Sequence, residues 1–118
     1  MQTLIGKKVG MTRVYDDAGV QVPVTVVQVG PCTVVQRKTA GTDGYEAAQL
    51  GFEEQKASRL TKPEQGHFQK AGAKPQKVLR EVRLADGEEA KAGDVVTAQV
   101  FEGVKYVDVL GHTKGRGF

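Results

Sequence analysis

The stretch "VQVPVTVVQV", residues 20–29, decides the fold class because valine recurs in it at every second position. Side chains of a strand alternate between its two faces, so the first four valines would share one face: Val20, Val22, Val24 and Val26. The last two valines fall on the other face, and this change of phase after Val26 predicts a β-bulge or a strand buried on both faces. Pro23 lacks an amide hydrogen, so this part of the strand is expected to lie at a sheet edge or to have its N position facing outward.

Strand character extends outward from this stretch. Gly30 and Pro31 end the first strand, and the turn signal at residues 41–44 makes residues 33–52 a predicted hairpin. A further strand is expected at residues 77–84, and residues 95–101 and 104–110 are expected to form a second hairpin around Glu102 and Gly103. Six or seven short strands predict an antiparallel barrel or a compact sheet.

One short helix interrupts the strands at residues 61–72. Thr61 is its expected N-cap, Pro63 lies in its first turn, and Glu64 completes a capping-box spacing. Gly72 is the expected stop, whereas Gly66 weakens the interior by about 1 kcal/mol relative to alanine. The helix should therefore depend on docking against the strands.

Bulk composition excludes several protein classes. The 118 residues suit one domain, and 39% hydrophobic with 26% charged residues is ordinary for a globular chain. No apolar run approaches the roughly 20 residues that a membrane helix needs, and the N-terminus has no apolar signal core. The single cysteine, Cys32, cannot form an internal disulfide, which suits the cytoplasm.

Charge is unevenly distributed along the chain. The formal net charge is only +3, but residues 56–83 contain eight cations and two acids, and residues 84–104 contain five acids and one cation. Such asymmetry indicates either one surface directed at a polyanion or a solvated mosaic of charges.

The residues that could support catalysis form no known pattern. The opening "GKKVGMTRVY", residues 6–15, departs from a phosphate-binding loop, because Met11 and Thr12 follow Gly10. Cys32, His67 and His112 lack metal-ligand spacing, so neither an enzyme nor a metal or other cofactor is expected. A free cysteine among β-branched residues is usually a small buried hydrophobe.

Nucleic-acid binding is the remaining hypothesis. Lysines and arginines alternate with small residues, which leaves room for a phosphate backbone, and aromatic content is only 6%. These features favour folded RNA recognised by shape and phosphate contacts over single strands read by stacking. The candidate RNA-binding residues are Lys7, Lys8, Arg13, Arg37, Lys38, Arg59, Lys62, His67, Lys70, Lys74, Lys77, Lys114 and Arg116.

Several segments together resemble the N-terminal part of the bacterial large-subunit ribosomal protein three family. They are "IGKKVGMTRVYDDAG", "VPVTVVQVGPCTVVQRKT", "DGYEAAQLGF", "KPEQGHFQKAGA", "LREVRL" and "VDVLGHTKGRGF". The resemblance implies a mainly β fold, a six-stranded antiparallel β-barrel of the translation-protein type with one short helix. It implies no enzymatic activity.

The resemblance also implies partners and a division of the chain. Residues 1–110 would form the RNA-binding barrel, with the helical insertion near 61–72, and residues 111–118 a glycine-rich basic tail at the base of a longer extension. The implied partners are large-subunit (23S-type) rRNA and neighbouring ribosomal proteins, with no membrane, in the cytoplasmic ribosome. Subunit assembly near the peptidyl transferase region is the implied role, and Lys114 and Arg116 match the base of the extension that reaches toward it.

One departure from the family leaves a second interpretation open. Family members continue past the position of Phe118, and their later chain supplies further strands to the barrel. The alternative is therefore a shortened barrel that acts as a protein-interaction or self-associating module through an open sheet edge.

Overall fold

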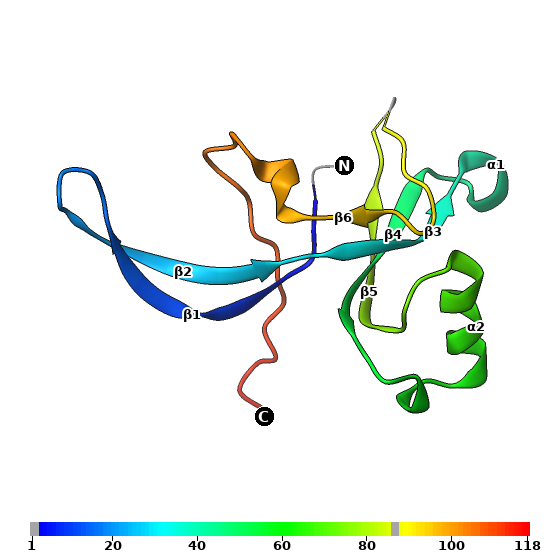
Figure 1. The fold of residues 1–118 in the computed structure, drawn as a ribbon. Helices are drawn as coiled ribbons and strands as arrows, with labels where there is room; N and C mark the ends of the chain where they lie inside the picture. The colour runs from blue at the N-terminus through cyan, green and yellow to red at the C-terminus, as the bar shows by residue number, and fades with distance from the viewer. Residues whose placement is uncertain (1–2, 86–87) are drawn as a thin grey trace.

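The computed structural model describes residues 3–85 and 88–118, and its strands form two separate antiparallel sheets (Figure 1). The two-stranded sheet, called the arm, consists of β1 (Gly6–Tyr15) and β2 (Gln21–Val29). The second, called the core sheet, has the strand order β5-β4-β3-β6. Its strands are β3 (Cys32–Lys38), β4 (Ala47–Glu54), β5 (Gln76–Arg83) and β6 (Val95–Val96). The helices are α1 (Ala40–Asp43) and α2 (Lys62–Ala71), with 3₁₀ turns η1 (Ala57–Arg59) and η2 (Ala98–Phe101).

The arm confirms the edge position predicted from proline. Pro23 pairs with Arg13, and within the described residues neither strand of the arm has a second neighbour. The loop at its tip is closed by Asp16, whose carboxylate accepts a 2.8 Å hydrogen bond from the Val20 amide. At the other end Gly30, at a φ of 68°, turns the chain from β2 into β3.

A β-bulge lies opposite the place where the valine pattern changes phase. Lys8 pairs with Val27 and Gly10 pairs with Val26, so the extra residue is Val9 in β1, not a residue of β2. The predicted irregularity is therefore correct in position along the arm, but it belongs to the partner strand. Opposed residues of antiparallel strands share a face, and the bulge consequently exchanges the faces on one side of it.

This register gives the arm two different faces. One face, called the valine face, carries Val14, Val22, Val24 and Val26. Because of the bulge, Lys8 lies on the opposite face together with Arg13, whereas Lys7 lies on the valine side. We call the side with Lys8 and Arg13 the cation face.

The core sheet buries the apolar centre of the protein. Val34 and Leu50, from paired positions of β3 and β4, are both fully buried, as is Cys32. Partly buried residues from distant segments pack against this cluster: Leu4, Ile5, Val78, Val82 and Val96. The core is therefore assembled from long-range contacts, and the predicted hairpin of β3 and β4 is confirmed as its centre.

Helix α2 packs on the core sheet and buries Phe68. Thr61 occupies the N-cap and Gly72 the C-cap, with Gly72 at a φ of 70°, so both predicted ends are confirmed. The capping-box prediction is wrong, because the Thr61 side chain makes no capping hydrogen bond. Gln65 instead donates hydrogen bonds to the carbonyls of Ala57 and Leu60, which joins η1 to the first turn of the helix.

The second predicted hairpin is wrong. Only Val95 and Val96 pair as a strand, η2 follows, and residues 104–118 have no regular secondary structure. Residues 104–110 have strand-like composition, but they pair with no strand in the described part of the chain. Their apolar side chains stay in water, with Leu110 96% exposed. Composition alone cannot supply the missing partner strand.

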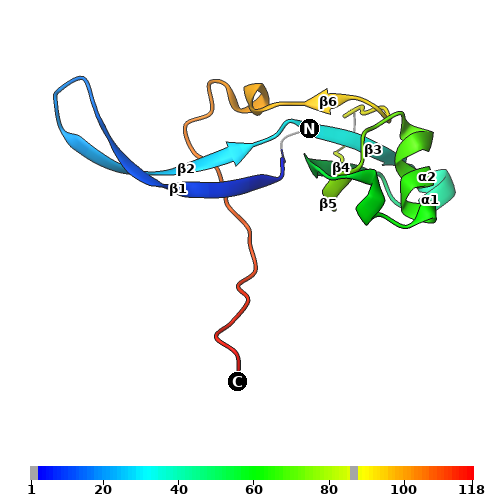
Figure 2. The same cartoon turned by 60° about the horizontal axis from the view of Figure 1, so that its bottom comes forward.

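The protein is mainly β, as predicted, but the described strands do not close into a barrel. The arm and residues 104–118 leave the core sheet in different directions (Figure 2). The radius of gyration is 17.2 Å, against about 13.5 Å for a compact chain of this length. The accessible surface is 9410 Å², against roughly 6,200 Å² for a compact monomer of this mass. Much of the chain is thus extended and open to contact.

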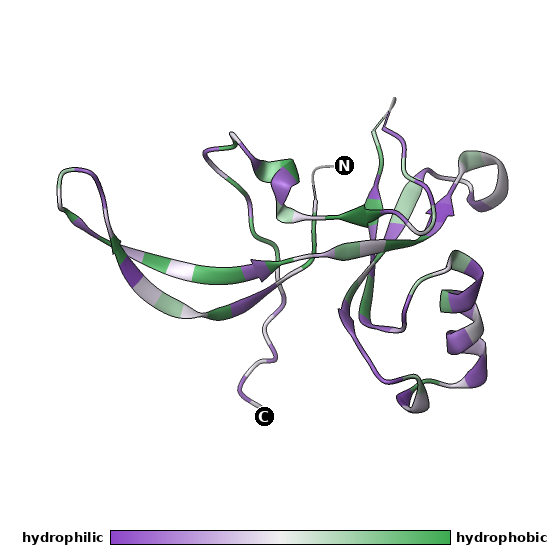
Figure 3. Ribbon diagram, viewed as in Figure 1, coloured by the Kyte–Doolittle hydropathy of each residue, from purple (hydrophilic) through white to green (hydrophobic). Residues whose placement is uncertain are grey.

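Hydrophobic residues lie along the exposed arm as well as in the core sheet (Figure 3). On the valine face, Val26 is 43% exposed and Val14 49% exposed. No helix among the described residues is both long and apolar enough to cross a membrane.

Candidate nucleic-acid interface

The cation face of the arm presents two charges to solvent. Lys8 and Arg13 are exposed, and neither forms an ion pair with another described residue. Lys7 behaves differently, because its Nζ lies 3.2 Å from a carboxylate oxygen of Glu53 at the end of β4. Consecutive residues of a strand lie on opposite faces, and the bulge after Lys8 decides that Lys8, not Lys7, shares the face of Arg13.

Glu53 reaches Lys7 from an unusual backbone conformation. Its φ is 60°, in the left-handed region that non-glycine residues rarely adopt. The resulting ion pair joins the arm to the core sheet across 46 positions of sequence. Exposed fractions of 60% for Lys7 and 26% for Glu53 indicate a partly solvated pair of modest strength.

Arg37 and Lys38, both of β3, are engaged within the core sheet. Arg37 lies 3.7 Å from Glu46 and also donates to the Ala47 carbonyl. Lys38 pairs with Glu81 and donates a 3.2 Å hydrogen bond to the Tyr45 hydroxyl. About four fifths of each side chain is buried, with 21% of Arg37 and 19% of Lys38 exposed. These two predicted site residues therefore have internal partners that a phosphate would have to displace.

The Lys38 network also shifts its ionisation equilibria. The hydrogen bond to Glu81 raises the pKa of Lys38, and the same hydrogen bond lowers the pKa of Glu81. Tyr45 donates a 2.6 Å hydrogen bond to Glu81, and the Arg83 guanidinium lies 4.2 Å from the Tyr45 ring centre. Lys38 and Glu81 are therefore both stabilised in their ionised forms, as expected for an ion pair with a structural role.

Residues around η1 and α2 supply the largest group of solvent-facing cations. Four of the predicted residues there are exposed and have no ion pair within residues 3–85 and 88–118: Arg59, Lys62, Lys70 and Lys77. Lys74 lies 3.7 Å from Glu54, but both side chains are highly exposed, so this pair is weak. These cations could bind phosphates without breaking a buried contact.

His67 faces the core sheet. Its Nε2 lies 2.7 Å from Oε1 of Gln49, and its ring meets Phe68 edge to face. The imidazole therefore holds α2 against β4, and its Nε2 is already occupied. Sequence alone places it beside the lysines of the helix without showing this orientation.

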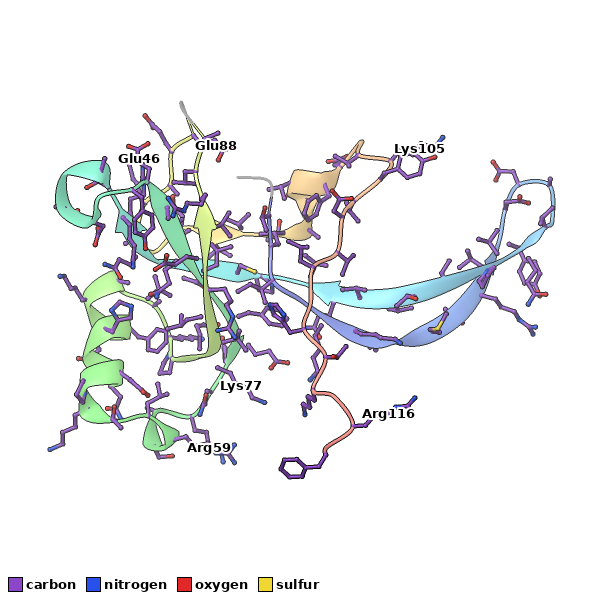
Figure 4. All side chains as sticks on the ribbon, turned by 180° about the vertical axis from the view of Figure 1, so that it is seen from behind. Glu46, Arg59, Lys77, Glu88, Lys105 and Arg116 are labelled. Atoms are coloured by element: carbon purple, nitrogen blue, oxygen red, sulfur yellow. The ribbon has the colours of Figure 1, made fainter. Side chains whose placement is uncertain are left out.

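The tail residues Lys114 and Arg116 are exposed, in a segment without regular structure. Arg59, Lys77 and Arg116 lie toward one end of the molecule and Glu46 and Glu88 toward the other (Figure 4). Glu88 of the acidic stretch thus lies apart from Arg59 and Lys77 of the basic stretch, whereas Lys105 lies on the same side as Glu88 (Figure 4).

Two basic residues that the candidate set omits lie beside it. Arg80, on β5, is exposed, and its guanidinium donates a hydrogen bond to the neighbouring Leu79 carbonyl. Lys56 immediately precedes η1 and is exposed. Both belong to the basic stretch of residues 56–83, so the charge pattern contained the signal that could have identified them.

The arrangement offers little for catalysis. In the described part of the chain, no three His, Cys, Asp or Glu side chains come together as a metal site. Cys32 is buried, as predicted, and its thiol lies 3.6 Å from the Ile5 carbonyl. Burial raises the pKa of this thiol, which disfavours a nucleophilic thiolate. What the exposed cations can do is neutralise a polyanion.

Comparison with known proteins identifies close relatives but no matching family model. The chain is 51% identical over 115 residues to large ribosomal subunit protein uL3 of Desulforudis audaxviator, covering 98% of this chain and 54% of that protein. It is 53% identical over 120 residues to the uL3 protein of Thermotoga maritima, covering 100% and 56%. The uL3 protein of Natranaerobius thermophilus is 47% identical over 117 residues, covering 99% and 56%. The chain thus spans about half the length of the curated relatives it matches.

Proposed function

The chain matches the N-terminal part of the large ribosomal subunit protein uL3 family over nearly its whole length, and on this basis we propose that it is a structural constituent of the large ribosomal subunit that binds large-subunit rRNA. The observation that carries the proposal is the set of exposed cations without internal acidic partners. Among the predicted RNA-binding residues, those that are exposed and have no ion pair within the described part of the chain are Lys8, Arg13, Arg59, Lys62, Lys70, Lys77, Lys114 and Arg116.

The mechanism is electrostatic clamping. Each exposed lysine or arginine neutralises a phosphate and releases condensed counterions, which gives affinity without sequence selectivity. The core sheet fixes the cations of α2 relative to β5, and the Lys7–Glu53 pair restrains the arm relative to the core sheet. Cations held in fixed positions favour an RNA whose phosphates have a matching folded shape.

The exposed valine face supports a finer proposal about the fold. A two-stranded ribbon with three exposed valines on one face, Val14, Val22 and Val26, is unusual for a protein that acts alone. The arm forms one wall of the six-stranded barrel that the family resemblance implies, and its valine face is the surface on which further strands of that barrel would pack.

The remaining parts of the proposal come from the family resemblance of the sequence. The protein has no enzymatic activity, resides in the cytoplasmic ribosome and contacts neighbouring large-subunit proteins as well as rRNA. It supports subunit assembly near the peptidyl transferase region, and the tail with Lys114 and Arg116 leads toward that region.

The clamp is tested by salt-dependent binding of large-subunit rRNA fragments. Replacing Lys8 and Arg13 by alanine removes two phosphate contacts, so the slope of log K against log salt should fall in magnitude by about 1.5. The control replaces Lys91 and Lys105, which lie in or next to the acidic part of the chain, and makes the same change in net charge. If the slope of log K against log salt fell equally in both double variants, the effect would be one of net charge alone. The arm would then not be part of the RNA interface.

The rival function is self-association through an open edge. β5 has no outer neighbour in the described part of the core sheet, and apolar residues of the tail are exposed, as Leu110 is. Light scattering without RNA distinguishes the two functions. A monomer that binds rRNA tightly supports the clamp, whereas stable dimers that ignore rRNA would favour the rival.

A further inference from the structure

A cleft of about 410 Å³ lies between α2 with its preceding turn and the outer strand β5. Its apolar lining comes from Leu60, Pro63, Phe68 and Leu79, and His67 and Gln76 add polar groups to the wall. Leu60 and Leu79 are half-buried and Phe68 is buried, so the cleft has an apolar floor that opens to solvent. Its volume falls in the range of small-ligand sites, which are largely apolar with a few polar groups.

The rim of the cleft is positively charged. Lys77 and Arg80 line it, and both are exposed and without an acidic partner among the residues that the structure describes. Arg59, adjacent to Leu60, adds a third cation nearby, and Arg59 and Lys77 lie toward the same end of the molecule (Figure 4). The lining contains a single carboxylate, that of Glu64. A cleft with an apolar interior and a cationic rim fits a ligand that has a flat apolar group and negative charge next to that group.

The position beside β5 adds polar groups for recognition. β5 is the last strand of the core sheet, so along its outer edge alternate backbone amides and carbonyls have no strand partner. Glu64 offers carboxylate oxygens that can accept a hydrogen bond from the exocyclic amino group of adenine or cytosine. A nucleobase has this combination of π-face, polar edge and attached phosphates.

We propose that the cleft between α2 and β5 takes one unstacked nucleobase of single-stranded RNA, with the adjoining phosphates on Lys77 and Arg80. The inference rests on the proposed RNA binding and adds the kind of RNA segment that this part of the surface recognises. A duplex offers no free base, so the cleft distinguishes a loop or bulge from a regular helix. The arm, by contrast, needs only phosphates.

The first test is an NMR titration of the ¹⁵N-labelled protein with two probes, the single-stranded hexanucleotide rC₆ and a blunt-ended RNA duplex. The hexanucleotide should shift the amide signals of Leu60, Phe68 and Leu79, and the duplex should leave these three unchanged. Absence of shifts in the cleft with rC₆ overturns the inference. Tighter binding of hexaglutamate than of rC₆ at the same signals also overturns it, because it would assign the cleft to an acidic peptide.

The second test fills the cleft without changing its charge. Leu60→Trp should weaken rC₆ binding by about fivefold or more, the loss expected for one stacked base. Duplex binding should stay within about twofold, the range of neutral surface substitutions. The matched control is Leu110→Trp on the exposed tail, which should leave both affinities within that range. Equal weakening of rC₆ and duplex by Leu60→Trp overturns the inference.

These results separate the inference from the proposed function. If large-subunit rRNA fragments do not bind while rC₆ shifts the cleft signals, the ribosomal role fails and the nucleobase site stands. If rRNA fragments bind with the expected salt slope while rC₆ leaves the cleft unchanged, the ribosomal role stands and the nucleobase site fails. The titration of the unaltered protein decides the question even where Leu60→Trp does not fold.

Discussion

The arm and the core sheet both contain β-prone strands with valines, but they use these strands for opposite purposes. In the core sheet, Val34 is fully buried, and Lys38 is paired within a network of side chains. In the arm, Val26 is 43% exposed, and Arg13 faces solvent without an ion pair to any described residue. The difference lies in what covers each sheet, because other segments of this chain pack on the core sheet and none of those described covers the valine face. A strand pattern thus predicts a strand, but its neighbours decide whether that strand stabilises the protein or serves as a contact surface.

The largest difference in stability is expected when a valine is replaced by alanine in each of the two regions. Val34→Ala should lower the free energy of unfolding by about 2 kcal/mol, because it removes buried methyl groups and leaves a cavity. Val26→Ala should change it by less than about 0.5 kcal/mol, as expected for a surface position. Urea denaturation measures both. Equal losses would mean that the valine face is covered in the folded protein.

Glycines in the two regions provide a second matched pair. A Cβ at Gly51 of β4 would lie 2.6 Å from Cγ of Gln76 and 3.2 Å from a methyl carbon of Val35. Gly51→Ala should therefore destabilise by about 1 kcal/mol or more through overpacking. A Cβ at Gly10 of the arm meets nothing within 4 Å, so Gly10→Ala should be neutral or stabilise by up to about 0.5 kcal/mol. The order of the two melting temperatures checks the prediction, and the reverse order would contradict it.

The ionic network of the core sheet predicts an acid-dependent loss of stability. Lys38 and Tyr45 hold the pKa of Glu81 below its ordinary value, so the folded state favours the ionised carboxylate. This contribution is complete above the unfolded-state pKa of about 4.3 and is lost as pH falls through the lower pKa of the folded state.

Replacing Glu81 by Gln isolates this contribution. The variant should lose less stability than the unaltered protein when denaturation at about pH 6 is compared with denaturation at about pH 3. Glu89→Gln, an exposed carboxylate outside the network, is the control and should follow the unaltered protein. If the free energy of unfolding fell with pH equally in all three proteins, the Lys38–Glu81 network would not contribute to the pH dependence.

The smallest effect is expected where the two regions meet. Glu53→Gln breaks the ion pair to Lys7, and because that pair is partly solvated, stability should change by less than about 0.5 kcal/mol. The released lysine can then bind a phosphate, so affinity for rRNA fragments should rise slightly and the salt slope should steepen by up to about 0.9. An unchanged slope would show that Lys7 stays away from RNA even when unpaired.

Local features of the fold were accessible from the sequence because short-range physics fixes them. Thr61 and Gly72 bound α2 as expected, and Gly30 with Pro31 separates β2 from β3. The hairpin of β3 and β4 needs only two β-prone runs and a turn between them. The prediction of a second hairpin was wrong because a β-prone run becomes a strand only where a partner strand is available.

The candidate site was less predictable, because side-chain partners come from distant parts of the chain. Lys7 is adjacent to Lys8 in sequence, yet it pairs with Glu53 and lies on the other face of the arm. Lys38 resembles the other lysines in sequence, but Glu81 and Tyr45 hold it in the core sheet. No spacing rule foretells these pairings.

Residue order alone predicts the period-two strands, helix α2, the uneven charge and the similarity to uL3, whereas helix α1 lies where the sequence predicts only a turn. The tertiary structure decided which cations remain available, on which face of the arm each lies, and that the described strands form two open sheets. The physical reason is that a charge becomes free or paired, and a valine buried or exposed, only when residues tens of positions apart are brought together.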